Sequence, residues 1–128
     1  VLSELPIFLA NSINLGLLLP YPREPSQLLN AKLLAKLPWG SFLLNPGRGG
    51  LVIEKDIIAA LDSGQIAGAA LDVFSEEPLP HAHPFWSDFN VIITPHVASM
   101  THPKTASAFV ANNISRHLSG KKMVGLVK

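Results

Sequence analysis

Short apolar runs alternate with helical stretches along this chain, and this alternation limits the possible fold more than any other feature. The order favours βαβ units and a mostly parallel sheet. The apolar runs are continuous, without polar residues at every second position, which is typical of strands covered on both faces. We expect four strands, at Ile13–Leu18, Ser41–Asn45, Gly68–Val73 and Val91–Thr94.

The segments between these runs carry helical patterns. Leucines at helical spacing predict one crossover helix over Ser26–Leu37, and a second is predicted over Glu54–Ser63, ending at Gly64. A last helix is expected to open with Thr101 as its cap and Pro103 in its first turn. It runs to Gly120 and buries one apolar stripe.

The segment 75–90 is rich in proline and polar residues, which favours a long loop with one helical turn at Phe85–Asp88. Loops of this length often carry function.

Composition excludes several classes of protein. The chain has 128 residues, of which 48% are hydrophobic, enough for the core of one globular domain. A net charge of +1 gives no field that would attract nucleic acid or an anionic membrane. The absence of cysteine rules out disulfides and thiolate metal sites and fits a reducing compartment, so we expect a cytoplasmic protein. The apolar N-terminal stretch is interrupted by Glu4, Pro6, Asn11 and Asn14 and lacks the features of a signal peptide, so it is predicted to be folded structure.

Three polar residues of different chemistry follow three of the expected strands. Arg48 comes after the second strand, Asp72 closes the third, and His96 follows the fourth. Ligands of open parallel sheets bind outside the carboxyl ends of the strands, so we expect these side chains to converge on one crevice. Such a convergence suits a reaction site.

Three motifs in fixed order resemble the coenzyme domain of the D-2-hydroxyacid dehydrogenases, and the similarity covers nearly the whole chain. They are Asn45-x-x-Arg48-Gly49, then LDVF at 71–74 followed by Glu76-Glu77-Pro78, then Thr94-Pro95-His96. The run HVASMT from His96 is similar to the glyoxylate/hydroxypyruvate reductase branch. The resemblance implies an α/β fold, the parallel-sheet half of a Rossmann-like NAD(P)-binding domain followed by a C-terminal helix.

The resemblance also implies a catalytic set of Arg48, Glu77 and His96. An imidazole titrates near neutral pH, so His96 would supply the proton when a 2-oxo acid is reduced to its 2-hydroxy acid. Glu77 would hold the ring and favour the imidazolium. Arg48 would hold the substrate carboxylate or carbonyl in a fork of N–H donors, a geometry that lysine lacks.

The cofactor contacts implied by the family involve a second, overlapping set. Asp72 would accept a hydrogen bond from the nicotinamide carboxamide, and Leu19-Pro20 would line the cofactor, although Pro22 departs from the usual Thr or Asn. The full expected set is Leu19, Pro20, Pro46, Gly47, Arg48, Asp72, His96, Ala98 and Ser99. The cofactor is NADP or NAD, and the resemblance to the glyoxylate reductase branch favours NADP.

Simpler interpretations stand beside these. Taken singly, Arg48 is typical of a surface ion pair, and Glu77 is typical of a solvated loop residue. His96 alone is typical of a structural histidine, and Asp72 alone is typical of an Asx-turn. The pair His81-x-His83 has no third ligand at a telling spacing, so no metal site is predicted. A second class of protein also stays open: a non-catalytic NAD(H)-binding regulatory or interaction protein of the same fold.

The phosphate-binding G-x-G-x-x-G of a dinucleotide domain is missing from the sequence. The only G-x-G is Gly47-Arg48-Gly49, and Val52 stands where the third glycine would be. We therefore expect a C-terminal fragment of a longer enzyme, inactive alone and a homodimer when complete. Residues 1–100 would be half of the NAD(P)-binding domain, and the helix and tail at 101–128 would pack on an absent substrate domain.

Overall fold

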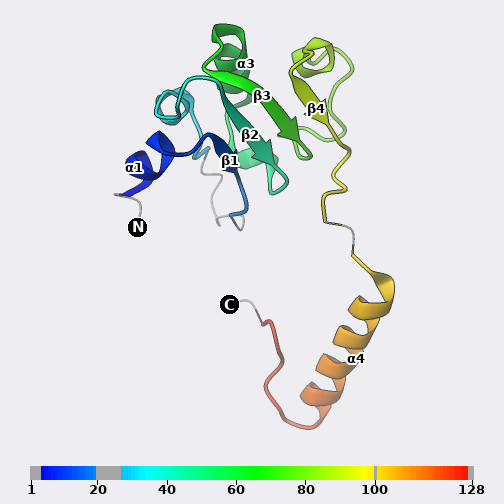
Figure 1. The fold of residues 1–128 in the computed structure, drawn as a ribbon. Coiled ribbons are helices and arrows are strands. Elements are labelled where there is room, and N and C mark those ends of the chain that lie inside the picture. Colours follow the sequence, from blue (N-terminus) through cyan, green and yellow to red (C-terminus); the bar gives the residue numbers. More distant parts are fainter. Residues whose placement is uncertain (1–3, 20–26, 100, 127–128) are drawn as a thin grey trace. The chain divides into compact units, whose positions relative to one another are not determined.

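The computed structural model describes residues 4–19, 27–99 and 101–126. They belong to two compact units, Val1–Ala98 and Ser99–Lys128. The first unit contains a sheet with its covering helices, and the second contains one helix and a tail (Figure 1).

The first unit is built on a four-stranded parallel sheet in the order β1-β2-β3-β4. Its strands are β1 (Asn14–Gly16), β2 (Ser41–Asn45), β3 (Ile66–Leu71) and β4 (Val91–Ile93). Each strand pairs with the next in the sequence, so the carboxyl ends of all four lie along one edge of the sheet. The predicted parallel α/β fold is confirmed, with β3 beginning and ending two residues earlier than expected and β1 shorter than expected.

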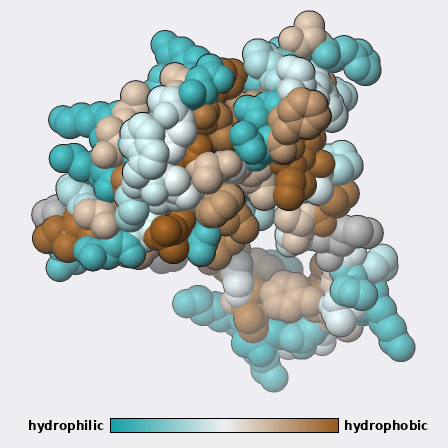
Figure 2. All heavy atoms as spheres, turned by 45° about the horizontal axis from the view of Figure 1, so that its top comes forward, coloured by the Kyte–Doolittle hydropathy of each residue, from teal (hydrophilic) through white to brown (hydrophobic). Residues whose placement is uncertain are grey.

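One face of the sheet carries the core, and the other is largely uncovered in the described residues. In β2, Ser41, Leu43 and Asn45 are buried, whereas Phe42 and Leu44 are exposed. The expectation that both faces are covered is therefore wrong for this unit. The continuous apolar run reflects an open face that is also apolar, and apolar residues reach the surface of the unit in Figure 2.

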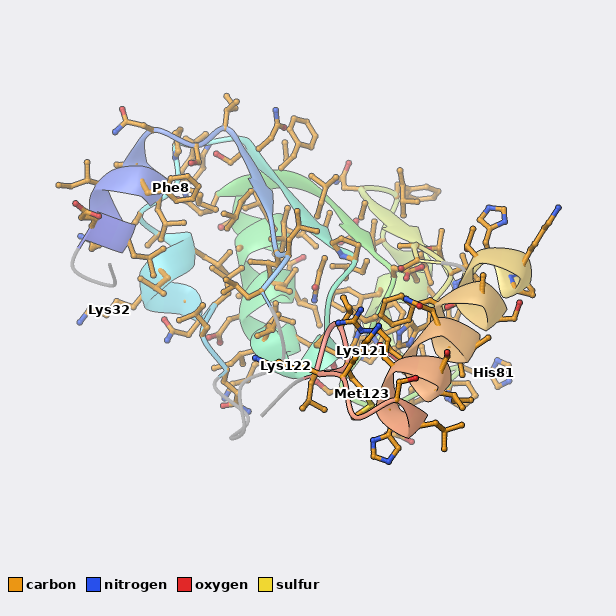
Figure 3. All side chains as sticks on the ribbon, turned by 90° about the horizontal axis from the view of Figure 1, so that it is seen from below. Phe8, Lys32, His81, Lys121, Lys122 and Met123 are labelled. Carbon is orange, nitrogen blue, oxygen red and sulfur yellow. The ribbon has the colours of Figure 1, made fainter. Side chains whose placement is uncertain are left out.

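The helices of this unit lie on the core side of the sheet (Figure 3). They are α1 (Leu5–Ala10), α2 (Ala31–Leu34) and α3 (Glu54–Ser63), with short 3₁₀ turns η2 (Gly49–Leu51) and η3 (Pro84–Ser87). The structure confirms the predicted bounds of α3. Its first turn carries Glu54 and Asp56, whose negative charges stabilise the helix at the positive end of its dipole. Gly64 ends the helix in the left-handed conformation.

The predicted helix Ser26–Leu37 is much shorter in the structure. Asn30 caps α2 by accepting a hydrogen bond from the N–H of Leu33, and Leu29 pairs in a parallel bridge with Val52. Leu29 is also buried, as part of the core. The leucine spacing favours a longer helix because a pairing with a distant segment leaves no trace in local periodicity.

The second unit consists of α4 (Pro103–Leu118) and a tail that folds back along it. Helix α4 begins after His102, not after the predicted cap Thr101, and His102 makes no side-chain cap hydrogen bond. The side chain of Asn113 both donates to and accepts from the backbone of Val124. No residue of α4 is buried, so the predicted burial of its apolar stripe is not seen within the unit.

Among the described residues, no helix is both long and apolar enough to cross a lipid bilayer.

Candidate active site

The loop after β2 is shaped by the buried side chain of Asn45. Its Oδ1 accepts the N–H of Gly47 at 3.2 Å, and its Nδ2 donates to the carbonyl of Arg48 at 3.1 Å. A Cβ at Gly47 would lie 2.7 Å from the carbonyl oxygen of Leu17 in the chain after β1. The loop thus needs glycine at 47 to pack against the neighbouring segment.

Arg48 leaves this loop towards solvent. Its side chain is exposed, and its Nη1 donates to the carbonyl of Gly47 at 2.7 Å. Within the described residues it forms no ion pair with Glu77 or His96. The structure therefore pairs two of the three predicted catalytic residues, Glu77 and His96, and Arg48 lines neither hollow of the site.

Asp72, at the end of β3, anchors the turn that follows β4. Its Oδ1 accepts the hydroxyl of Thr94 and the N–H of Val97, and its Oδ2 accepts the N–H of Ala98. Burial raises the pKa of Asp72, but these hydrogen bonds from Thr94, Ala98 and Val97 outweigh it and lower the pKa below its ordinary value. Asp72 is therefore an ionised group that holds the His96 turn in place.

His96 lies within that turn. Its φ of 54° lies in the left-handed region, uncommon for a residue with a side chain. Its main-chain N–H donates to the carbonyl of Asp72 at 2.9 Å. The turn is thus fixed from β3 by both the side chain and the backbone of Asp72.

The imidazole of His96 meets the carboxylate of Glu77. Nδ1 of His96 lies 2.8 Å from Oε2 of Glu77, and Oε1 of Glu77 accepts the N–H of Phe74 at 2.9 Å. The hydrogen bond from His96, and next the one from Phe74, lower the pKa of Glu77 against the opposing effect of burial. A carboxylate only accepts, so Nδ1 carries a hydrogen and Nε2 is the nitrogen available for proton transfer.

Two hollows adjoin the turn after β4, at the carboxyl edge of the sheet. One, of about 510 Å³, is lined by Glu77 and His96 together with Trp86 and other mostly apolar side chains. The other, of about 150 Å³, is lined among others by Pro46, Asp72 and Ala98. Asp72 and Thr94 line both hollows. Three predicted cofactor residues therefore lie around one small space that adjoins the His96 turn.

The other predicted cofactor residues are not gathered at this space. Leu19 lines a separate apolar hollow of about 300 Å³ with Phe8 of α1 (labelled in Figure 3). Ser99 is the first residue of the second unit. Pro20, and Pro22 where the sequence departs from the family pattern, lie outside the described residues.

No group of three or more histidine, aspartate or glutamate side chains in the described residues is arranged to hold a metal ion. His83, one of the two histidines weighed for such a site, lies 3.6 Å from Glu54.

Asn45 and Thr94 belong to two of the family-like motifs, but the sequence predicts no structural or catalytic role for either residue. Asn45 stands two residues before a glycine, which is a signal for an Asx-turn. Nothing local indicates that Thr94 donates to Asp72, because that contact joins two strands 22 residues apart.

The lowered pKa of Asp72 predicts how stability depends on pH. A carboxyl whose folded pKa lies below the unfolded value of 3.8 stabilises the fold fully above that value and loses this contribution as the pH falls through the folded pKa. Asp72→Asn in the complete protein is expected to cost roughly 1–3 kcal/mol at pH 7. The difference from wild type should shrink below about pH 4, as followed by urea unfolding between pH 3 and pH 7. A difference that stays constant with pH would contradict this role, and Asp62→Asn, on the exposed surface of α3, is the control.

Comparisons with known proteins bear on this geometry. Residues 2–98 match the sequence model of the NAD-binding domain of the D-isomer specific 2-hydroxyacid dehydrogenases. The chain belongs to this family of oxidoreductases.

Individual relatives carry more specific names. The chain is 43% identical over 125 residues to glyoxylate/hydroxypyruvate reductase A of Yersinia enterocolitica, with 98% of this chain and 40% of that protein covered. A D-isomer specific 2-hydroxyacid dehydrogenase from Xanthobacter autotrophicus, solved with NADPH and MES, shares 45% identity and a TM-score of 0.95 over 99% of this chain and 52% of that one. An NADPH-dependent glyoxylate/hydroxypyruvate reductase from Sinorhizobium meliloti, solved with NADP and sulfate, shares 37% identity and a TM-score of 0.93 over 98% of this chain and 42% of that one. The chain therefore spans about two fifths of the length of the curated relative.

The smaller hollow is lined by a carboxylate that has room for one more hydrogen bond. Each carboxylate oxygen can accept two hydrogen bonds, and Oδ2 of Asp72 accepts only one from the described residues. Asp72, which carries this remaining acceptor position, lines the smaller hollow together with Pro46 and Ala98. A carboxamide N–H is the kind of donor that would complete it.

Proposed function

We propose that the complete protein carrying this chain reduces a small 2-oxo acid, glyoxylate or hydroxypyruvate, to the 2-hydroxy acid with NADPH or NADH. NADPH is the preferred donor in this proposal, because the two solved relatives described above contain NADPH or NADP. The residues of this chain alone, which carry no G-x-G-x-x-G, are proposed to be inactive.

One observation carries the proposal: the 2.8 Å contact between Nδ1 of His96 and Oε2 of Glu77, beside the ionised Asp72. A histidine oriented by a carboxylate can give its other ring hydrogen to a carbonyl oxygen that gains negative charge. The nicotinamide supplies the hydride when bound. His96 donates the proton from Nε2, and Glu77 stabilises the imidazolium from which that proton leaves.

Arg48 is proposed to bind the substrate carboxylate or carbonyl. Its guanidinium is exposed, and its one hydrogen bond within the described residues goes to a carbonyl of its own loop. The fork of N–H donors is therefore free to pair with the two oxygens of a carboxylate.

The test is NADPH and then NADH oxidation by the complete protein with glyoxylate and with hydroxypyruvate, followed by absorbance at the nicotinamide band. Turnover that requires Arg48 and His96 is expected. A folded protein that binds NADPH but turns over neither acid would reject the proposal in favour of the non-catalytic regulatory protein. The 128-residue chain, assayed alongside, is expected to show no turnover.

Arg48→Ala is expected to lower kcat/KM for glyoxylate by about 10- to 100-fold, the value of one charge-assisted hydrogen-bonded contact. Arg48→Lys should recover only part of this loss, because an ammonium group lacks the planar fork. Lys36→Ala removes a positive charge from an exposed position and is the matched control, with kcat/KM unchanged. An Arg48→Lys variant with full activity would show that charge alone is needed at this position.

A further inference from the structure

The loop that carries Glu77 is fastened to the start of α3 by one side chain. Oε1 of Glu54 accepts the N–H of Ser75 at 2.8 Å, just before Glu77 in the sequence. Oε2 of the same carboxylate lies 3.6 Å from Nε2 of His83, six residues after Glu77. Glu54 thus contacts both ends of the segment 75–83.

The orientation of His83 is set by a further hydrogen bond. Its Nδ1 accepts the N–H of Phe85 at 3.3 Å, so the ring hydrogen is on Nε2, the nitrogen that faces Glu54. The imidazole also packs on the ring of Phe85 with centroids 4.6 Å apart. Because Phe85 is fully buried, the far end of the loop is fixed to the core as well as to Glu54.

Between these two attachments Leu79 is buried in the core, whereas the residues around Glu77 are not. Ser75, Glu76, Glu77 and Pro78 are all exposed. The N–H of Phe74, which Glu77 accepts, precedes the peptide whose N–H is bound by Glu54. Movement of the Ser75 backbone would therefore displace the donor that helps to hold the Glu77 carboxylate.

We propose that Glu54 is a positioning residue for the reaction: by fastening Ser75 and His83 to α3, its carboxylate holds Glu77 against His96. This inference rests on the proposed function for its catalytic part. Glu54 touches neither Glu77 nor His96 in the structure and acts through the loop backbone. It lies in the first turn of α3 and lines neither of the two hollows at the carboxyl edge of the sheet.

The test compares Glu54→Ala, Glu54→Asp and Glu54→Gln in the complete protein, with Glu76→Ala as the control. Glu76 lies in the same loop and makes no hydrogen bond or ion pair with the described residues. The readouts are the pKa of the Glu77 carboxyl, from NMR titration with ¹³C-labelled glutamate, and kcat and KM for glyoxylate. Thermal melting identifies variants that fail to fold.

Loss of the fastening should raise the Glu77 pKa towards its ordinary value and lower kcat by about tenfold, with KM little changed. Glu54→Ala should show the full effect, and Glu54→Asp, whose shorter carboxylate falls short of Ser75, should show part of it. Glu54→Gln keeps an oxygen that accepts the Ser75 N–H but turns an amide NH2 towards the N–H of His83, so it should show part of the effect. Glu76→Ala should change neither readout.

A folded Glu54→Ala or Glu54→Asp variant with an unchanged Glu77 titration would overturn the proposal, as would an equal change in Glu76→Ala. If Glu54→Ala fails to fold, the Asp and Gln variants decide the matter by the same titration. If the wild-type protein shows no turnover, the proposed function fails, and the titration alone then shows whether Glu54 positions Glu77.

Discussion

Replacing His96 by alanine is expected to lower kcat of the complete protein by about 10² to 10⁴, the usual contribution of a positioned general acid. The physical reason is the arrangement around the ring: Nδ1 is committed to Glu77 at 2.8 Å, and Nε2 is left for the substrate. Alanine removes the donor and leaves water as the only source of the proton. The measurement is NADPH oxidation with glyoxylate under saturating conditions.

His96→Gln tests whether hydrogen bonding alone is enough. An amide can hydrogen-bond to a carbonyl but does not give up a proton near neutral pH, so this variant should be nearly as slow as alanine. His117→Ala, which removes an exposed imidazole from α4, is the matched control and should keep wild-type kcat. Retention of at least half of the wild-type kcat in both His96 variants would remove the proton-donor role from this residue.

Gly49→Ala is expected to destabilise the complete protein by about 3 kcal/mol or more, at the upper end of what overpacking costs. A Cβ at Gly49 would lie 2.0 Å from both the carbonyl carbon and the oxygen of Phe74, and 2.6 Å from the nitrogen of Ser75. These are backbone atoms, so no rotation of a side chain relieves the overlap. Urea unfolding would measure the loss.

Gly16→Ala is the control for this substitution. A Cβ at Gly16 meets no atom within 4 Å, and the change is expected to alter stability by less than about 1 kcal/mol. The Phe74–Ser75 peptide that Gly49 supports precedes Glu77, so a folded Gly49→Ala variant should also lose activity. A Gly49→Ala protein as stable as Gly16→Ala would show that the contact between η2 and the loop is not close in solution.

Much of the fold could be predicted from the sequence because its signals are local. The bounds of α3 follow from apolar spacing, acidic residues in the first turn and a glycine at the end. β2 was found with correct bounds because its apolar run is enclosed by turn residues. The contact of His96 with Glu77 was expected only through the order of the family's motifs, since nothing in either local segment indicates the other residue.

The remaining features depend on contacts between distant segments. Leu29 was placed in a helix because its spacing is helical, whereas the structure pairs it with Val52 across the chain. Phe42 and Leu44 were expected to be covered because they are apolar, but apolar character does not reveal which residues cover a face. The catalytic role of Arg48 and the cofactor role of Asp72 stay predictions, and the anchoring role of Asp72 became visible only from its bonds to Thr94, Val97 and Ala98.

The sequential strand order has a consequence for how this sheet is assembled during synthesis. Each strand pairs with the one made immediately before it, so a ribosome delivers the strands in the order in which they are needed. Every new pairing closes only one short crossover, which keeps the entropic cost of each step low. Among the four described strands, none needs a partner encoded further downstream than the next strand. The last strand delivered, β4, leads directly into the turn that holds His96, so the anchor at Asp72 is already in place when the histidine arrives.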